Sequence, residues 1–107
     1  MKEFNIKITA KSNDEIVQIK VEGKITIESV SIFEETVYEV INKDIKKIKI
    51  NFQKLTYIDS SGIGALIKAV NVCKKSSIEM VLTNVSAEIL KLFKTGYIEN
   101  FFTIENN

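Results

Sequence analysis

The residues with the most potential for chemistry form one run, Asp59-Ser60-Ser61, which is followed by Gly62 and Gly64. The run lies where a predicted strand meets a predicted helix, at the edge of an α/β sheet where functional sites usually form. Aspartate and serine are favoured helix N-caps, so capping explains one of the three polar residues but not all of them. If Asp59 is the cap, the Ser60 hydroxyl lies at the positive end of the helix, where the dipole and the free amides tolerate a phosphate.

Gly62 and Gly64 need an explanation of their own because both fall in the first turn of the predicted helix. A glycine inside a helix costs about 1 kcal/mol relative to alanine. Either another chain or a ligand approaches the helix closely here, or the helix packs tightly against the sheet. The residues alone leave both explanations open.

Residue inventory excludes several kinds of active site. The chain of 107 residues has no histidine and a single cysteine, Cys73, which excludes a structural zinc site, a Cys-His nucleophile pair and a Ser-His-Asp triad. The phosphate-binding patterns G-x-x-x-x-G-K-S/T and G-x-G-x-x-G and the nucleophile elbow G-x-S-x-G are absent from the sequence. Ser60 as an enzymatic nucleophile would need a lysine or a carboxylate as its base. We therefore expect a protein that is not an enzyme and has no cofactor and no metal.

Charge and hydropathy narrow the class of protein further. Fifteen basic residues, all lysine, balance fourteen acidic residues to a net charge of +1. Because arginine supplies most specific base contacts, and because the lysines here alternate with acids, we expect no nucleic-acid partner. No apolar run approaches the roughly 18 residues of a membrane span, so we expect no membrane segment and a cytoplasmic protein.

The period of the apolar residues predicts alternating strands and helices. Alternation and β-branched residues predict strands at Phe4–Ala10, Ile16–Val21, Ile48–Phe52 and Ile78–Thr83. The first two form a hairpin whose second strand ends at Gly23. Between the third strand and the next helix, the segment Leu55–Asp59 connects the two elements.

Helical spacing predicts three helices, over about residues 30–42, from Ser60 and Ser61 to Cys73, and from Ser86 to Gly96. Ser29 caps the first helix, or Ser31 does so in a capping box with Glu34. Ser86 and Gly96 are the N-cap and C-cap of the third helix.

The predicted order is β-β-α-β-α-β-α, in a single α/β domain over residues 1–107. Because β-α-β crossovers place parallel strands side by side, we expect a mixed sheet of four or five strands covered by helices, with the hairpin as its antiparallel part. Tyr97–Ile104 forms a further helix or an edge strand. Phe101 and Phe102 either pin this segment to the core or form an interaction surface.

The segment Leu55-Thr-Tyr-Ile-Asp-Ser-Ser-Gly-Ile-Gly-Ala-Leu66 resembles the signature of the STAS domain, and specifically of bacterial anti-sigma factor antagonists. Val21–Ile25 resembles the family's second strand and glycine turn, and Leu92–Gly96 resembles a helix end of the family. The resemblance implies that Ser60 is the phosphorylated residue. It also implies partner contacts at Asp59, Ser61, Gly62, Ile63, Gly64 and Thr26.

The resemblance further implies a regulatory cycle. The unphosphorylated protein binds an anti-sigma factor that is also a serine kinase and so frees a sigma factor. Phosphorylation releases the kinase, and a serine phosphatase resets the cycle. This sequence has Thr26 where family members often have an aspartate after the glycine turn, which changes the partner contact expected at that loop.

Two other functions remain open at this point. One is a STAS scaffold subunit of a transporter or a sensory complex, in which Ser60 is not phosphorylated. The other, from a different class, is a small serine-dependent hydrolase or a phosphoryl carrier, and the absence of histidine argues against the hydrolase.

Overall fold

The computed structural model describes residues 4–12, 15–42 and 44–106. These residues form, in chain order, β1 (Phe4–Ser12), β2 (Ile16–Ile25), α1 (Val30–Val40), β3 (Lys47–Ile58), α2 (Ser60–Lys75), β4 (Glu79–Thr83), α3 (Ala87–Thr95), the 3₁₀ turn η1 (Glu99–Phe101) and β5 (Thr103–Glu105). The predicted order β-β-α-β-α-β-α is confirmed. The C-terminal segment, whose structure the sequence left open, contains both a short helical turn and an edge strand.

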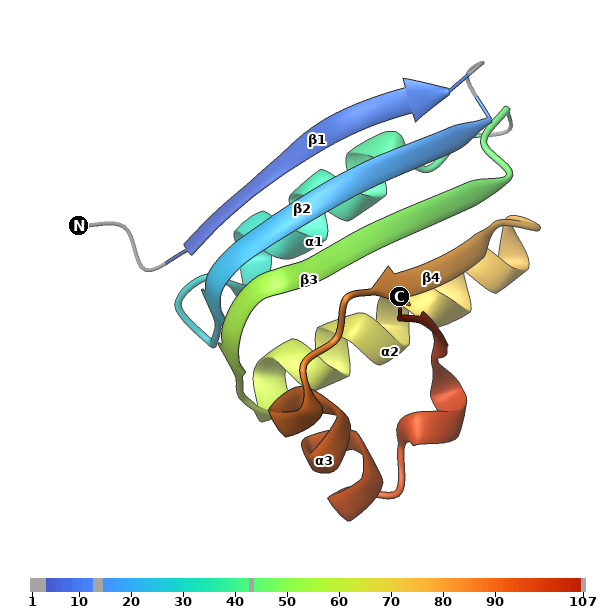
Figure 1. Ribbon diagram of the computed structural model, residues 1–107. Coiled ribbons are helices and arrows are strands. Elements are labelled where there is room, and N and C mark those ends of the chain that lie inside the picture. Colours follow the sequence, from blue (N-terminus) through green and yellow to red (C-terminus); the bar gives the residue numbers. More distant parts are fainter. Residues whose placement is uncertain (1–3, 13–14, 43, 107) are drawn as a thin grey trace.

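The strands form one mixed sheet in the order β1-β2-β3-β4-β5 (Figure 1). β1 pairs antiparallel with β2, and the remaining neighbours are parallel. The predicted mixed sheet with an antiparallel hairpin is therefore confirmed. Because β2 and β3 are parallel neighbours, each followed by a helix, the segments that lead into α1 and α2 meet at the same edge of the sheet.

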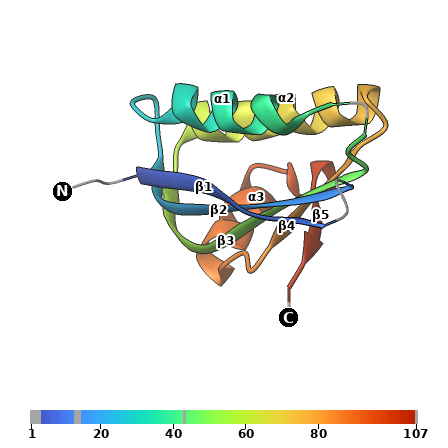
Figure 2. The ribbon, with the colours of Figure 1, turned by 90° about the horizontal axis from the view of Figure 1, so that it is seen from above.

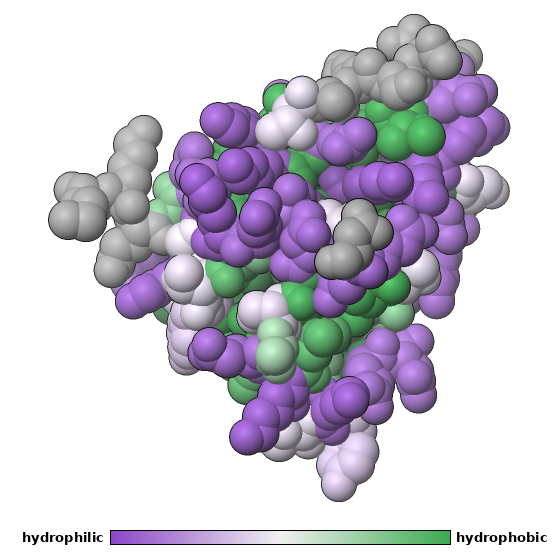
Figure 3. Space-filling model, in the orientation of Figure 1, coloured by the Kyte–Doolittle hydropathy of each residue, from purple (hydrophilic) through white to green (hydrophobic). Residues whose placement is uncertain are grey.

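α1 and α2 lie side by side on one face of the sheet (Figure 2). Their apolar stripes pack on the alternate residues of β2 and β3 that face them, and the largest fully buried side chains include Phe33, Phe52 and Phe93. The opposite face is the one seen in Figures 1 and 3. It is mostly hydrophilic in the upper part of Figure 3 and hydrophobic towards the lower centre.

Three strands are longer than the sequence predicts: β1 extends by two residues to Ser12, and β2 and β3 extend further. β2 does not end at Gly23 but continues to Ile25, and β3 does not end near Phe52 but continues to Ile58. The alternation of the sequence breaks because the β2–β3 register shifts at Lys20/Glu22 and again at Gly23/Lys24. Gly23 allows the second irregularity because its φ of 93° lies in the left-handed region.

The first helix begins at Val30, as the sequence predicts, but its cap and its end differ from the prediction. Ser29 is at the N-cap position of α1, but its side chain makes no capping hydrogen bond, and Ser31 lies inside the helix. The predicted capping box of Ser31 is therefore wrong, and the helix ends at Val40 instead of about Asn42. Ser86 does cap α3, because its Oγ accepts a hydrogen bond of 3.1 Å from the Ile89 amide.

The C-terminal segment is held by one of its two phenylalanines. Phe102 is buried and its ring lies 4.7 Å from that of Phe93 in α3, whereas Phe101 is 47% exposed. The side chain of Asn106 then accepts a hydrogen bond from the Val85 amide and donates one to the Val85 carbonyl. Phe102 therefore pins the segment to the core, as the sequence allowed.

Candidate functional site

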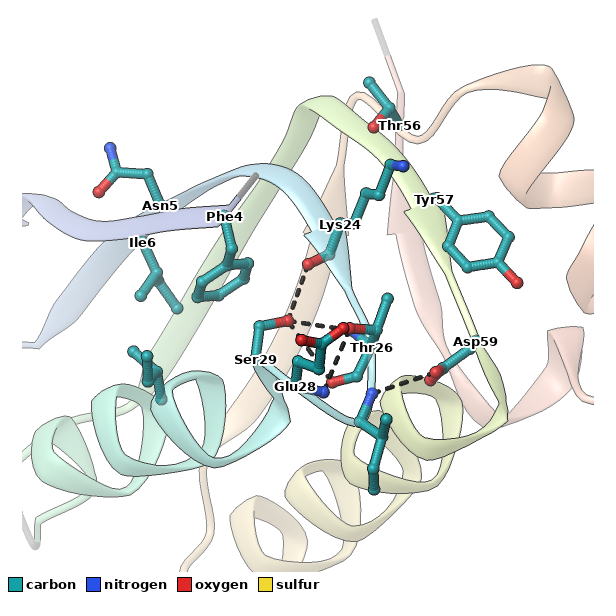
Figure 4. Close-up of a pocket in the computed structure, with 12 residues that line it drawn as sticks. Phe4, Asn5, Ile6, Lys24, Thr26, Glu28, Ser29, Thr56, Tyr57 and Asp59 are labelled. Carbon is teal, nitrogen blue, oxygen red and sulfur yellow. Dashed lines mark hydrogen bonds between the residues drawn. The ribbon is translucent and has the colours of Figure 1, made fainter. Parts of the chain in front are cut away.

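Asp59 joins two segments that are far apart in the sequence. It is the N-cap of α2, one of the three candidates that the sequence left open, because its Oδ1 accepts a hydrogen bond of 3.0 Å from the Gly62 amide. Its Oδ2 accepts a second hydrogen bond, of 3.1 Å, from the Ile27 amide, which Figure 4 shows as a dashed line. Both carboxylate oxygens are thus used, and the turn between β2 and α1 is tied to the start of α2.

That turn, residues 26–29 and hereafter the β2–α1 turn, is also held from within. The Thr26 amide donates to Ser29 Oγ at 3.0 Å, and the Ser29 hydroxyl donates to the Lys24 carbonyl at 2.8 Å. The Glu28 amide donates to Thr26 Oγ1 at 3.2 Å. The side chain of Ser29 is used in these bonds and not in capping α1, which explains why the N-cap of that helix lacks a side-chain bond.

Ser60 and Ser61 are the first two residues of α2. Ser60 is exposed and Ser61 is half-buried. Neither hydroxyl and neither amide forms a hydrogen bond with another described residue. The Ser60 hydroxyl is therefore accessible at the positive end of a 16-residue helix, beside two amides that still have the capacity to donate.

The two glycines of this helix have different surroundings. A Cβ at Gly62 would lie 2.6 Å from Ile58 Cγ1 and 2.9 Å from the Ile25 carbonyl, so tight packing within the domain explains this glycine. A Cβ at Gly64 would meet nothing within 4 Å, and Gly64 is exposed. Ile63, between them, is half-buried and packs against the core. The surface of the first turn of α2 is thus open at Gly64 and closed at Gly62.

A groove of about 1030 Å³ lies beside this helix start, at the ends of β2 and β3 (Figure 4). Thr26 and Asp59 line it, whereas Ser60 and the predicted contact residues 61–64 do not. The other lining residues come from β1, the end of β2, the β2–α1 turn, α1 and the end of β3: Phe4, Asn5, Ile6, Lys24, Ile27, Glu28, Ser29, Ile32, Thr56 and Tyr57.

Sequence reasoning did not find the apolar part of this groove. Ile27 is 71% exposed, Ile32 is 50% exposed and Tyr57 is 49% exposed. Ile32 falls off the apolar stripe of its helix, and Tyr57 belongs to the part of β3 that was predicted to be a connection. The one local signal was Ile27 itself, an apolar residue inside a polar turn.

The described residues offer little for other chemistry. None of them form a group of three or more His, Cys, Asp or Glu side chains that could hold a metal ion. Within the same residues, no helix has the length and apolarity that crossing a bilayer requires. What the arrangement can do is present one serine hydroxyl, and an apolar groove next to it, to another molecule.

The STAS domain family model matches residues 7–107 of this sequence. The chain belongs to the STAS domain family. A curated relative, the anti-sigma-B factor antagonist of Bacillus subtilis, is 25% identical over 101 residues, which cover 94% of this chain and 92% of the relative. The resemblance inferred from the segment Leu55–Leu66 is therefore confirmed at the level of the family.

Solved structures show the same fold in proteins of two kinds. The anti-sigma factor antagonist SpoIIAA in its unphosphorylated form has a TM-score of 0.71 and 21% identity, covering 97% of this chain and 88% of its own. The Bacillus cell fate determinant SpoIIAA in the phosphorylated form has a TM-score of 0.70 and 20% identity, with coverage of 97% and 90%. A sulfate transporter family protein from Wolinella succinogenes has a TM-score of 0.67 and 19% identity, with coverage of 92% and 82%.

Proposed function

We propose that this STAS domain is a cytoplasmic anti-sigma factor antagonist that is controlled by phosphorylation of Ser60. In this proposal, the unphosphorylated chain binds an anti-sigma factor that is also a serine kinase, and phosphorylation releases that partner. The observation that carries the proposal is the exposed hydroxyl of Ser60 at the start of α2. Asp59, Thr26, Ser61, Ile63 and Gly64 lie around it, and they are proposed as partner contacts together with the backbone at Gly62.

The proposed reaction is carried out by the partner. The Ser60 oxygen attacks the γ-phosphorus of ATP, the bond from that phosphorus to the bridging oxygen breaks, ADP leaves, and a base of the kinase takes the hydroxyl proton. A serine phosphatase reverses the modification by hydrolysis, which returns the serine and gives inorganic phosphate. This chain supplies the acceptor oxygen and its position, and no step requires a base or a metal from the chain itself.

The position of Ser60 favours an effect on the partner over an effect on the domain itself. A phosphate adds a charge of about −1.5 to −2 and three acceptor oxygens. At the start of α2 it meets the positive end of the helix dipole and the unbonded amides of Ser60 and Ser61, which tolerate it. The same charge inside an interface would weaken binding, and a loss of about a hundredfold to a thousandfold needs only about 2.7 to 4 kcal/mol.

A second candidate function is a scaffold in a transporter or a sensory complex. It is favoured by one observation, the shared fold with a sulfate transporter family protein. In that case the chain binds its partner whether or not ATP is present, and Ser60 is not modified. The two candidates therefore differ in what ATP does to the complex.

The test is to immobilise the unphosphorylated chain, isolate the bound proteins from an extract of the source organism and then add ATP with Mg²⁺. The proposal predicts that a serine kinase is bound and that ATP releases it. The Ser60→Ala variant should bind the same kinase and keep it after ATP is added. If wild-type chain and variant release the kinase equally, or if no kinase binds, the proposed function is wrong.

A further inference from the structure

Ile27 is unusual because it is an isoleucine that is 71% exposed at a well-held position. Its amide donates to Asp59 Oδ2, and the residues on either side of it are fixed by the hydrogen bonds of Thr26 and Ser29. The Ile27 side chain is therefore exposed even though hydrogen bonds hold the backbone around it. A side chain presented on a preorganised backbone loses less entropy when it is bound.

The surroundings of Ile27 offer apolar contact and little charge. Ile32 and Tyr57 line the same groove and are about half exposed. The charged residues of the groove are Lys24, Glu28 and Asp59, and both oxygens of Asp59 already accept hydrogen bonds. A molecule that fits this groove would present apolar side chains to it.

A protein interface of ordinary size is large enough to cover both Ser60 and Ile27. A stable interface buries about 800 Å² on each side, which corresponds to a disc of about 16 Å radius. Ser60 follows Asp59 directly, and Asp59 Oδ2 lies 3.1 Å from the Ile27 amide nitrogen. A footprint of this size centred on Ser60 therefore includes Ile27, and residues near the centre of an interface usually dominate its binding energy.

We propose that Ile27 is the residue by which this chain selects its partner, with Ile32 and Tyr57 as flanking contacts. The partner inserts an apolar side chain into the groove beside Ser60, and this contact sets affinity without taking part in the transfer of phosphate. The inference rests on the proposed function, because the partner in question is the kinase that acts on Ser60. The resemblance to the family implies a partner contact at the neighbouring Thr26, and the inference adds a selecting contact at Ile27.

The test compares the affinity of the isolated kinase for Ile27→Ser, for Ile27→Val and for Tyr97→Ser as the matched control. Tyr97 is 92% exposed and lies between α3 and η1, away from the groove. Thermal unfolding first establishes that all three variants are folded. We expect Ile27→Ser to lower affinity by about tenfold or more, as at other central contacts, and Ile27→Val to lower it by less than about threefold. Tyr97→Ser should bind like the wild type.

Two further readouts separate an apolar selecting contact from other roles. Ile27→Ser should raise the KM for phosphorylation of Ser60 and leave kcat unchanged. The ratio of wild-type affinity to Ile27→Ser affinity should change by less than about threefold between about 0.1 M and about 1 M salt, because screening acts on charges and not on an apolar contact. Unchanged binding by Ile27→Ser, or a ratio of the two affinities that falls steeply with salt, would overturn the inference.

Failure of the inference and failure of the proposed function give different results. If ATP releases the kinase and Ser60 is modified, but Ile27→Ser behaves like the wild type, only the inference is wrong. If Ser60 is never modified, the proposed function is wrong and the inference, which depends on it, is overturned as well.

Discussion

The starts of α2 and α3 show how a common structural device becomes part of a candidate site. Each helix begins with a side-chain oxygen that accepts a hydrogen bond from an amide three residues on, Asp59 from Gly62 and Ser86 from Ile89. Ser86 has one side-chain oxygen, and it makes this local cap. Asp59 has a second oxygen, which reaches Ile27, 32 residues earlier in the chain.

The surroundings of the two helix starts differ in the same way. At α2, the capped helix presents exposed Ser60 beside the groove that the β2–α1 turn completes. α3 contributes Ile89 and Phe93 to the core, and Phe93 contacts Phe102 of the C-terminal segment. The comparison teaches that α3 is held mainly by its apolar face, whereas the start of α2 is built from polar bonds that position a surface.

The largest expected effect is at α3. Phe93→Ala should lower the free energy of unfolding by about 3 to 5 kcal/mol, because it removes a fully buried ring and leaves a cavity against Phe102. Chemical denaturation measures the loss. The fraction of the variant that remains folded should still be phosphorylated on Ser60, and a specific loss of phosphorylation would contradict the division between the two regions.

The two glycines of α2 should respond in opposite directions to the same substitution. Gly62→Ala should destabilise the domain by about 1 to 3 kcal/mol, because its Cβ would overlap Ile58 and Ile25. Gly64→Ala should stabilise it by about 0.5 to 1 kcal/mol, because its Cβ enters open space and alanine favours the helix. Equal effects in thermal unfolding would show that the packing at Gly62 is not as described.

Substitutions at Asp59 and Ser86 separate the effect of losing a helix cap from the effect of losing the hydrogen bond to the β2–α1 turn. Asp59→Ala and Ser86→Ala should each cost about 0.5 to 2 kcal/mol as lost caps, but only Asp59→Ala should also weaken kinase binding or phosphorylation. Asp59→Asn sharpens the test, since asparagine still caps a helix but has one acceptor oxygen in place of two. It should keep most of the stability and lose part of the binding. Wild-type binding and phosphorylation by Asp59→Ala would refute the role of the link.

The smallest effect concerns the other end of α2, where Cys73 is buried. Burial raises the pKa of its thiol from 9.0 to about 11. Because the folded state favours the neutral thiol, this contribution to stability is complete below pH 9 and is lost as the pH rises through about 11. Cys73 in the folded protein should resist a thiol-modifying reagent near neutral pH and react after unfolding. Rapid labelling of the folded chain would contradict its burial.

The sequence predicted the elements better than their ends. Apolar periodicity identified every strand of the sheet except the edge strand β5, whose segment it left open, and it identified α1, α2 and α3, because burial on one face imposes that period. It failed at Gly23 and at Leu55, because register shifts between β2 and β3 break the alternation while the pairing continues. The first shift, at Lys20/Glu22, has no glycine to mark it, whereas the second falls at Gly23, where the sequence predicts the end of the strand.

The candidate site was predicted only where it is local. Asp59 as a cap and Ser60 at the helix start follow from one run of residues. The second bond of Asp59 and the groove depend on segments that only the fold brings together, from Phe4 to Tyr57. The difference between Gly62 and Gly64 was also hidden, since it depends on how close Ile25 and Ile58 come to the helix.

The central claim is that Ser60 is the residue through which the partner is released. The most direct measurement incubates the unphosphorylated chain with its kinase and ATP, maps the modified peptide, and follows binding of the kinase over the same time course. The account predicts one phosphate per chain, on Ser60, and a loss of binding that keeps pace with it. Modification of Ser61 alone, or equal modification of the Ser60→Ala variant, would contradict the account.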